Sequence, residues 1–323
     1  MQTRVPLLAV EDLSLEFRTR TGIVRALEQV SFEVGKGEMV GVVGESGSGK
    51  SVMSYAIMGI LDPAARITSG RVVFGGINLL RTPERELQEM RGREMSMIFQ
   101  DPRTALNPIR PVGSQLEDVI YRHGNLRGGR IRERAVELLR QVQIPDPERR
   151  LHAYPFELSG GMCQRVMIAM AVSCSPWLLI ADEPATGLDV TTQAVIMDLI
   201  KSLSAENNMV AILITHDLGL AAEYCDKIVV MHAGHVVEIG GTERLFRSPR
   251  HPYTEKLIGA TPRADGDLGR LSAIPGNLPD LRAELPACRY SSRCDRFSED
   301  CLEFPLPRLE SEPGHLVACR YPL

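Results

Sequence analysis

The sequence predicts an α/β fold in which a mostly parallel sheet is covered by helices on both faces. Three features lead to this prediction. Short, almost wholly apolar runs recur along the first 260 residues, helix-like patterns lie between them, and a glycine-rich stretch joins one apolar run to a helix. Apolar runs of this length suit strands buried on both faces. Their alternation with helical segments is typical of parallel sheets.

The individual elements follow from the same patterns. Helical periodicity predicts helices at 131–142, 160–174 and 190–206. Two hairpins are expected, one over 69–80 with a turn at Gly75-Gly76 and one over 228–239 with a turn at Ala233-Gly234. The expected buried strands are 39–43, 95–99, 178–181 and 210–215.

Two regions differ from this core. Residues 102–157 are polar and helix-rich and lie between two core strands, which indicates an inserted helical subdomain within a domain of residues 1–260. Residues 261–323 contain prolines at eight positions and four of the seven cysteines. Proline breaks regular structure, so we expect this extension to be loop-rich with little regular core.

Composition restricts the class of protein. The 323 residues carry a formal net charge of -4, whereas a nucleic-acid partner usually requires a basic surface. The longest uncharged stretch, 166–181, contains a proline and is shorter than the roughly 20 apolar residues that span a bilayer. The first residues do not resemble a secretory signal. We therefore expect a chain in the cytosol with reduced thiols.

A phosphate-binding loop is predicted between the strand at 39–43 and the helix that follows it. The stretch fits the pattern G-x-x-x-x-G-K-S, in which glycines let successive backbone N–H groups point at phosphate oxygens. The lysine reaches the β- and γ-phosphates and the final serine binds Mg²⁺. A simple glycine-rich turn is the alternative. The residues are Gly44, Glu45, Ser46, Gly47, Ser48, Gly49, Lys50 and Ser51.

An acidic pair, Asp182 and Glu183, ends the buried run 178–181. Asp182 is suited to hold Mg²⁺ through water, and Glu183 to orient or deprotonate the attacking water. An isolated acidic pair after a strand is usually a solvated turn. Its position downstream of a phosphate loop favours the catalytic interpretation.

A third motif resembles that of one particular protein family. Leu158-Ser159-Gly160-Gly161-Met162, followed by Gln164-Arg165, resembles the signature sequence of ATP-binding cassette (ABC) proteins. Ser159 is placed to cap a helix starting at Gly160, and the cap, the bare glycine amides and the helix dipole together form an anion site. The resemblance implies that Ser159, Gly160 and Gly161 face the ATP bound by a partner subunit.

Other positions match the family in its order. The resemblance implies that Gln100 senses Mg²⁺ and the γ-phosphate, that Asp189 lies in a loop at the dimer interface, and that His216 contacts the γ-phosphate. Phe17 is the candidate to stack on adenine, although an aromatic residue near a strand is commonly part of a core. The implied fold is a phosphate-loop (P-loop NTPase) ABC ATPase core with an antiparallel β subdomain, an inserted helical subdomain and a loop-rich C-terminal extension.

Within the family, the chain is most similar to the ATPase subunits of dipeptide, oligopeptide and nickel importers. The stretches that carry this similarity are 43–51, 98–102, 105–108 and 251–254, together with the cysteine-bearing tail. This resemblance implies ATP and Mg²⁺ as cofactors and a place on the cytoplasmic face of the cell membrane. It also implies two permease subunits, a second ATPase subunit that is either related or identical, and an extracytoplasmic solute-binding protein. The expected solutes are di- or oligopeptides, and nickel or another small solute is the alternative.

The tail cysteines, spaced C-x5-C-x6-C-x17-C, lack the short C-x2-C pairs common in zinc sites. Four thiolates can hold a [4Fe–4S] cluster, and the importer subfamily has a similar tail associated with such a cluster. Zinc and unligated thiols are the alternatives. The four residues are Cys288, Cys294, Cys301 and Cys319.

Two other classes of function were weighed against a transport ATPase. Soluble cassette ATPases that act on DNA or ribosomes generally carry two cassettes or long insertions, which this chain lacks. A regulatory subunit that binds but does not hydrolyse ATP would not need Glu183 and His216.

Overall fold

The computed structural model describes residues 6–124, 126–261 and 273–323, which form two compact units. Unit 1 combines Met1–Arg81 with Leu213–Leu323, and unit 2 is Thr82–Ile212. The expected helical subdomain, 102–157, falls within unit 2, and the expected extension, 261–323, falls within unit 1. Residues 262–272 of that extension lie outside the described residues.

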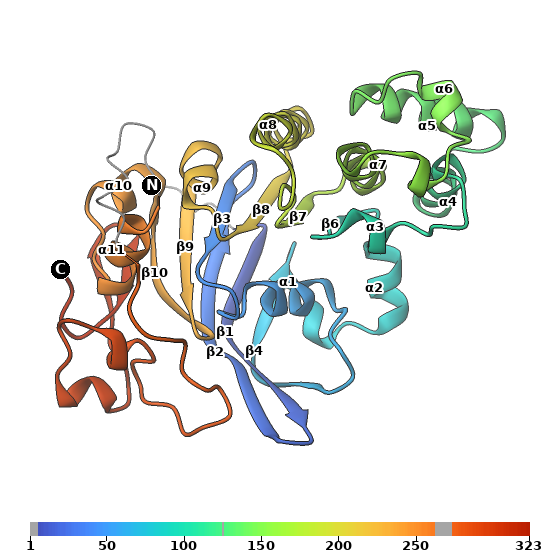
Figure 1. The fold of residues 1–323 in the computed structure, drawn as a ribbon. Coiled ribbons are helices and arrows are strands. Elements are labelled where there is room, and N and C mark those ends of the chain that lie inside the picture. The colour runs from blue at the N-terminus through green and yellow to red at the C-terminus, as the bar shows by residue number, and fades with distance from the viewer. Residues whose placement is uncertain (1–5, 125, 262–272) are drawn as a thin grey trace. The chain divides into compact units, whose positions relative to one another are not determined.

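Unit 1 contains an antiparallel sheet with the strand order β2-β1-β4-β5, of which Figure 1 labels β1, β2 and β4. The expected hairpin with the turn at Gly75-Gly76 is confirmed, because β4 pairs with β5 across these two glycines. Apolar side chains of the long strands, such as Leu13 and Leu15, are buried. The strands are β1 (Leu8–Thr19), β2 (Gly22–Val34), β4 (Ala65–Phe74) and β5 (Ile77–Asn78).

Five further strands of unit 1 follow the order β11-β12-β10-β9-β3. The buried strand β3 pairs in parallel with β9, and the expected hairpin turn at Ala233-Gly234 joins β9 to β10. Both turn residues have positive φ, 48° and 83°. The strands are β3 (Met39–Val43), β9 (Lys227–His232), β10 (His235–Gly241), β11 (Arg308–Glu312) and β12 (His315–Ala318). The helices of this unit are α1 (Lys50–Met58), α9 (Leu218–Tyr224), α10 (Thr242–Arg247) and α11 (Pro252–Gly259).

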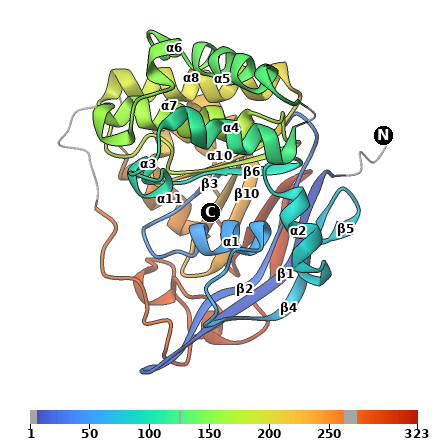
Figure 2. The ribbon, with the colours of Figure 1, turned by 90° about the vertical axis from the view of Figure 1, so that its right-hand side faces the viewer.

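Unit 2 is mainly helical (Figure 2). Its buried strands β6 (Met95–Ile98) and β7 (Leu178–Asp182) pair in parallel, and β8 (Val210–Thr215) starts in this unit. Leu116, Leu138 and Val166 are buried where helices α4, α5 and α7 pack together. The helices are α2 (Glu84–Met90), α3 (Pro102–Ala105), α4 (Val112–His123), α5 (Gly129–Gln141), α6 (Pro147–Arg150), α7 (Gly160–Val172) and α8 (Val190–Glu206).

The described part of the C-terminal tail, residues 273–323, has more regular structure than its proline content suggested. It is loop-rich, with 3₁₀ turns at Ser291–Arg293 (η4) and Glu299–Leu302 (η5), but its β11–β12 hairpin extends the sheet by pairing with β10. His315 of this hairpin lies 2.6 Å from the fully buried Glu238 of β10. The tail therefore shares the core of unit 1, which the expectation of little regular core missed.

No helix in the described part of the chain is long and apolar enough to cross a membrane.

Candidate functional site

The phosphate loop has the local structure that its sequence predicts. It leaves the buried strand β3 and ends at Gly49, after which α1 begins at Lys50. Gly44 has φ 150°, and a Cβ atom there would lie 2.1 Å from the carbonyl oxygen of Met231. Gly49 has φ 98°, and a Cβ atom there would lie 2.9 Å from the Ala26 carbonyl oxygen. Only glycine fits at these two points, because both the backbone angle and the space exclude a side chain.

Lys50 is 5% exposed, and its ammonium donates to loop carbonyl oxygens, at 2.8 Å to Gly44 and 3.0 Å to Glu45. The positive charge is thus held within the curl of the loop. Ser51 follows in the first turn of α1, as the Mg²⁺-binding serine of this motif does.

Two other predicted residues also lie in unit 1. Phe17 stands on β1, half-exposed, between Val24 and Ala65 of the neighbouring strands. His216 follows β8 and is exposed. The next residue, Asp217, caps α9 by accepting hydrogen bonds from the Gly219 and Leu220 amides at 2.8 and 3.1 Å. The cap sets the direction in which the chain leaves the histidine.

Unit 2 brings Gln100 and Glu183 together. Because β6 and β7 are parallel neighbours, the residues that follow them emerge at the same edge. The Gln100 amide donates to Glu183 Oε2 at 2.9 Å, and the Thr186 hydroxyl donates to the same oxygen, also at 2.9 Å. Asp182, the last residue of β7, is 2% exposed. The Glu183 carboxylate, the proposed base, is thus oriented by Gln100 and Thr186. The sequence analysis did not predict these two hydrogen bonds.

The signature segment forms the expected capped helix. Ser159 is the N-cap of α7 and accepts a hydrogen bond from the Met162 amide at 3.3 Å. Apart from the backbone of α7 itself and the adjoining residues, no atom of the described residues lies within 4 Å of where a Cβ on Gly160 would be, so the backbone there is open to a ligand. The buried Gln164 of α7 donates to the Pro184 carbonyl at 2.6 Å. The signature helix is thereby joined to the segment directly after Glu183.

Asp189 is the N-cap of α8, a role that the sequence analysis did not assign to it. It accepts hydrogen bonds from the amide and the hydroxyl of Thr192, at 3.0 and 2.7 Å. These hydrogen bonds lower the pKa of the Asp189 carboxyl. These bonds therefore favour the ionised form of Asp189. The residue is exposed at the start of the helix.

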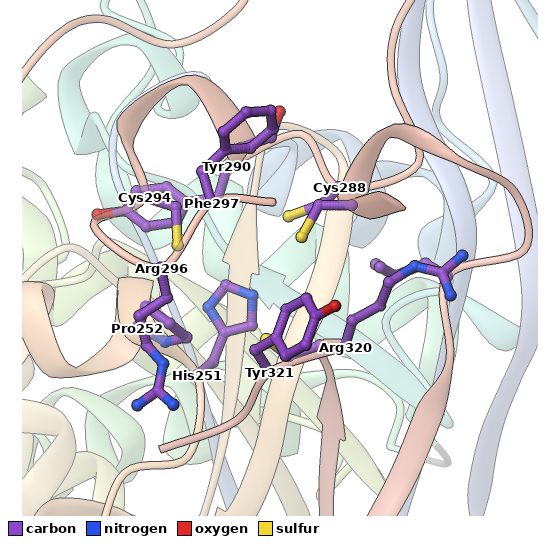
Figure 3. Close-up of a pocket in the computed structure, with 13 residues that line it drawn as sticks. His251, Pro252, Cys288, Tyr290, Cys294, Arg296, Phe297, Arg320 and Tyr321 are labelled. Atoms are coloured by element: carbon purple, nitrogen blue, oxygen red, sulfur yellow. The ribbon is translucent and has the colours of Figure 1, made fainter. Parts of the chain in front are cut away.

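The four tail cysteines line one small pocket, together with His251, Tyr290 and Phe297 (Figure 3). Burial raises the pKa of Cys288 to about 12, and the nearby thiols of the other three cysteines add to the effect. Burial also raises the pKa of Cys294 and of Cys319. Among the described residues, no three His, Cys, Asp or Glu side chains stand in an arrangement that could hold a metal ion. The donor chemistry suits a thiolate-bound metal, but the side chains would have to turn toward one another to bind one.

The fold and these sites define a class of protein: the chain belongs to the ABC transporter family. The family model described as "ABC transporter" matches residues 27–186, and a second one, "Oligopeptide/dipeptide transporter, C-terminal region", matches residues 237–301. The chain is therefore an ATPase whose hydrolysis of ATP is coupled to transport.

Named relatives share nearly the whole chain. The dipeptide transport ATP-binding protein DppD of Escherichia coli is 47% identical over 318 residues, which cover 98% of this chain and 97% of that protein. DppD of Bacillus subtilis is 45% identical over 314 residues, which cover 97% and 93%. Among solved structures, the dimeric ATP-binding cassette MJ0796 bound to ADP and Pi superposes with a TM-score of 0.66 at 28% identity. That match covers 73% of this chain and 98% of the cassette.

Proposed function

We propose that this chain is the ATP-hydrolysing subunit of an importer of dipeptides or oligopeptides. The observation that carries the proposal is the 47% identity to a dipeptide transport ATP-binding protein over 98% of the chain. The match of residues 237–301 to the C-terminal region of oligopeptide and dipeptide transporters supports it, because a general cassette would not need this region.

In this proposal each site residue keeps the role that the sequence assigned to it. Lys50 and the loop amides bind the β- and γ-phosphates, Phe17 stacks on adenine, and His216 contacts the γ-phosphate. Ser51, Asp182 and Gln100 would hold Mg²⁺, which would supply positive charge to offset that of the phosphates. Ser159, Gly160, Gly161 and Asp189 serve the ATP and the interface of a partner ATPase subunit.

Glu183 is the proposed general base. The hydrogen bonds that Glu183 accepts from Gln100 and Thr186 both fall on Oε2, so they restrain the carboxylate before water arrives. A carboxylate held in this way takes a proton from the attacking water without first having to reorient. Gln100 also connects the base to the helical region that follows it, so a change at the γ-phosphate can reach that region.

The proposed partners are two membrane permeases, a second ATPase subunit that is either identical or related, and, indirectly, an extracytoplasmic solute-binding protein. The chain would lie on the cytoplasmic face of the cell membrane. Within unit 2, Ile109 is 81% exposed between α3 and α4, and Phe156 is 75% exposed. Exposed apolar side chains within the expected helical subdomain suit a docking surface.

Uptake measurements test the proposed solute. In cells whose own copy is replaced by Glu183→Gln, we expect uptake of a labelled dipeptide to fall to background. If nickel uptake fell and dipeptide uptake did not, the solute assignment would be wrong.

A photo-reactive residue at Ile109 should capture a membrane subunit, whereas one at the exposed Glu133 of α5 should not. Equal capture from both positions would contradict the docking surface.

We further propose that Cys288, Cys294, Cys301 and Cys319 hold a [4Fe–4S] cluster. All four line one pocket. Burial raises the pKa of Cys288, Cys294 and Cys319, so a bound cation would be needed to keep these three thiols ionised. Protein purified without oxygen should be brown and contain about four irons per chain. Cys301→Ser should lower the iron content, whereas the control Cys174→Ser should not. Colourless protein with one zinc per chain would indicate a zinc site in place of the iron–sulfur cluster. Metal-free protein would contradict both kinds of metal site.

A further inference from the structure

Glu45, the second residue of the phosphate loop, is held by two side chains from the C-terminal part of the chain. Arg293 contacts both oxygens of the Glu45 carboxylate, with an Nη1–Oε2 distance of 2.8 Å and an Nη2–Oε1 distance of 3.0 Å. The Tyr253 hydroxyl accepts a hydrogen bond from the Glu45 amide at 3.0 Å. Both the side chain and the backbone of this loop residue are therefore anchored.

Arg293 is itself fixed in place. Its side chain is 2% exposed, and its Nε donates to the Pro275 carbonyl at 2.7 Å. Its Nη1 also lies 3.3 Å from Nε2 of His232. Burial lowers the pKa of His232 to about 3, so the ring is neutral and can accept a hydrogen bond from the guanidinium. A buried, forked arginine with this many partners holds a carboxylate in one orientation.

Tyr253 is equally constrained. It is fully buried at the start of α11, where its ring lies 4.6 Å from His232 and 5.3 Å from Tyr290 between ring centres. His251, the N-cap of α11, accepts a hydrogen bond from the Tyr253 amide at 3.0 Å. The start of the helix thus places the Tyr253 hydroxyl against the Glu45 amide, and burial and ring contacts restrain its side chain.

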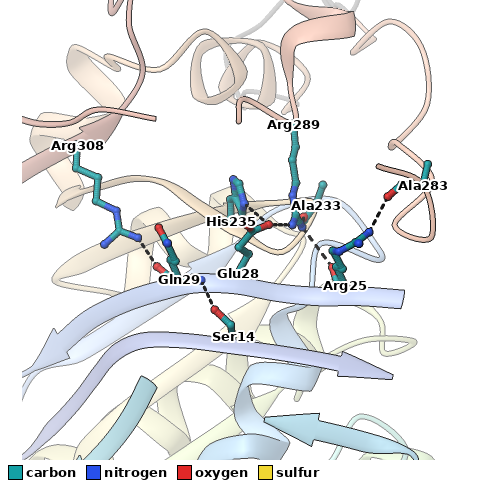
Figure 4. A network of polar contacts seen from close by, with 9 residues as sticks. All are labelled: Ser14, Arg25, Glu28, Gln29, Ala233, His235, Ala283, Arg289 and Arg308. Carbon is teal, nitrogen blue, oxygen red and sulfur yellow. Dashed lines mark hydrogen bonds and ion pairs between the residues drawn. The ribbon is translucent and has the colours of Figure 1, made fainter. Parts of the chain in front are cut away.

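Two other arginines, Arg289 and Arg308, fasten the tail through contacts with residues outside the phosphate loop. Arg289 contacts Glu28 of β2 and the carbonyl oxygens of Ala233 and Arg25 (Figure 4). Arg308 contacts the Gln29 carbonyl oxygen and lies 3.2 Å from Asp12. The tail would therefore stay attached to unit 1 without Arg293, so that residue's contact with Glu45 needs a separate explanation.

We propose that Arg293 and Tyr253 are positioning residues that hold the phosphate loop in its binding conformation through Glu45, so that the C-terminal region sets the affinity for ATP. The Glu45 carbonyl accepts hydrogen bonds from Lys50 Nζ at 3.0 Å and from the Ser48 amide at 3.2 Å. A shift of Glu45 would therefore move the lysine and the amides that bind phosphate.

Conservative substitutions with matched controls test the proposal on the full-length protein. Tyr253→Phe removes only the hydroxyl that holds Glu45, and Arg293→Met removes the charged fork. Tyr290→Phe is the control for the first, because its buried hydroxyl has no hydrogen-bond partner in the described chain. Arg308→Met is the control for the second, because it breaks a tail contact away from the loop.

The readouts are the dissociation constant for a fluorescent ATP analogue, KM and kcat for ATP, and the melting temperature without nucleotide. Each test variant should bind the analogue on the order of 5- to 50-fold more weakly, the usual size of coupling between linked sites. KM should rise while kcat at saturating ATP stays within about 2-fold, since the loop is intact once ATP is bound. Arg293→Lys should recover part of the affinity. Unchanged affinity in both test variants, or an equal loss in the controls, would overturn the proposal.

A double-mutant cycle separates positioning from general damage to the fold. Glu45→Gln should weaken binding of the analogue, and adding Arg293→Met to it should cost little more, because the partner charge is already gone. Fully additive losses would mean that Arg293 acts elsewhere in the tail, and would refute the role assigned to the ion pair.

Discussion

The substitution Glu183→Gln tests whether Glu183 is the general base, because it should remove the base and keep the structure around it. In the structure, Glu183 accepts one hydrogen bond from Gln100 and one from Thr186, each 2.9 Å long. A glutamine has nearly the same shape, and its amide oxygen can accept both bonds. The surroundings of residue 183 should therefore be preserved, while the ability to take a proton from water is lost.

The expected effect follows from that difference. A positioned general base contributes on the order of 10²–10⁴-fold to a rate, or about 2.7–5.5 kcal/mol of barrier. Loss of one hydrogen bond that only orients the base is expected to cost about 0.5–1.5 kcal/mol, or roughly 2- to 12-fold. Thr186→Val, which removes one such bond and keeps the carboxylate, is therefore the matched control.

The assay is steady-state ATP hydrolysis beside equilibrium ATP binding, with sizing of the protein with and without ATP. We expect Glu183→Gln to bind ATP as the wild type does, to hydrolyse it 10²–10⁴-fold more slowly, and to accumulate an ATP-bound dimer. Thr186→Val should remain within about 12-fold of the wild-type rate. Turnover by Glu183→Gln as fast as that of Thr186→Val would show that Glu183 is not the base. Loss of ATP binding would show that the substitution disturbed the site.

Two further predictions concern the loop and the C-terminal region. Lys50→Ala should lower ATP affinity or turnover on the order of 10²-fold or more, because the phosphates lose a charge-assisted donor and the loop loses the cation that bridges two of its carbonyls. Wild-type turnover in that variant would exclude the phosphate-loop assignment. His251→Asn should make stability less sensitive to acid, because burial lowers the pKa of His251 to about 3 from an ordinary 6.5. The folded protein keeps this ring neutral while the unfolded chain binds a proton, so its contribution to stability is complete above pH 6.5 and is lost as the pH falls toward 3. Asparagine still caps α11, so urea unfolding at pH 7, 6 and 5 should show a slope reduced by up to about 1.4 kcal/mol per pH unit. Equal slopes in variant and wild type would contradict this.

The sequence by itself determined the elements whose signals are contiguous. The strand, loop and helix around residues 39–58 are adjacent in the chain, so a local pattern predicts both their structure and the phosphate chemistry of the loop. The apolar runs of β3, β7 and β8 begin where expected, since a strand buried on both faces needs an unbroken apolar segment. The Ser159 cap was predictable because a cap and its helix are neighbours in the sequence.

Only the tertiary structure decided which distant residues meet. Gln100 and Glu183 are 83 positions apart, and they pair because β6 and β7 are neighbours in a sheet, which no local pattern specifies. Tyr253 belongs to a stretch that marked a subfamily in the sequence, but its contact with the Glu45 amide exists only once α11 is packed beneath the loop. Arg293 lies in a tail that its prolines predicted to be irregular, and irregular backbone can still bury charged side chains when each of their polar groups finds a partner. Such pairings depend on the packing of whole segments, and for that reason the chain's sequence predicts the residues of the ATP site but not the side chains that hold them in place.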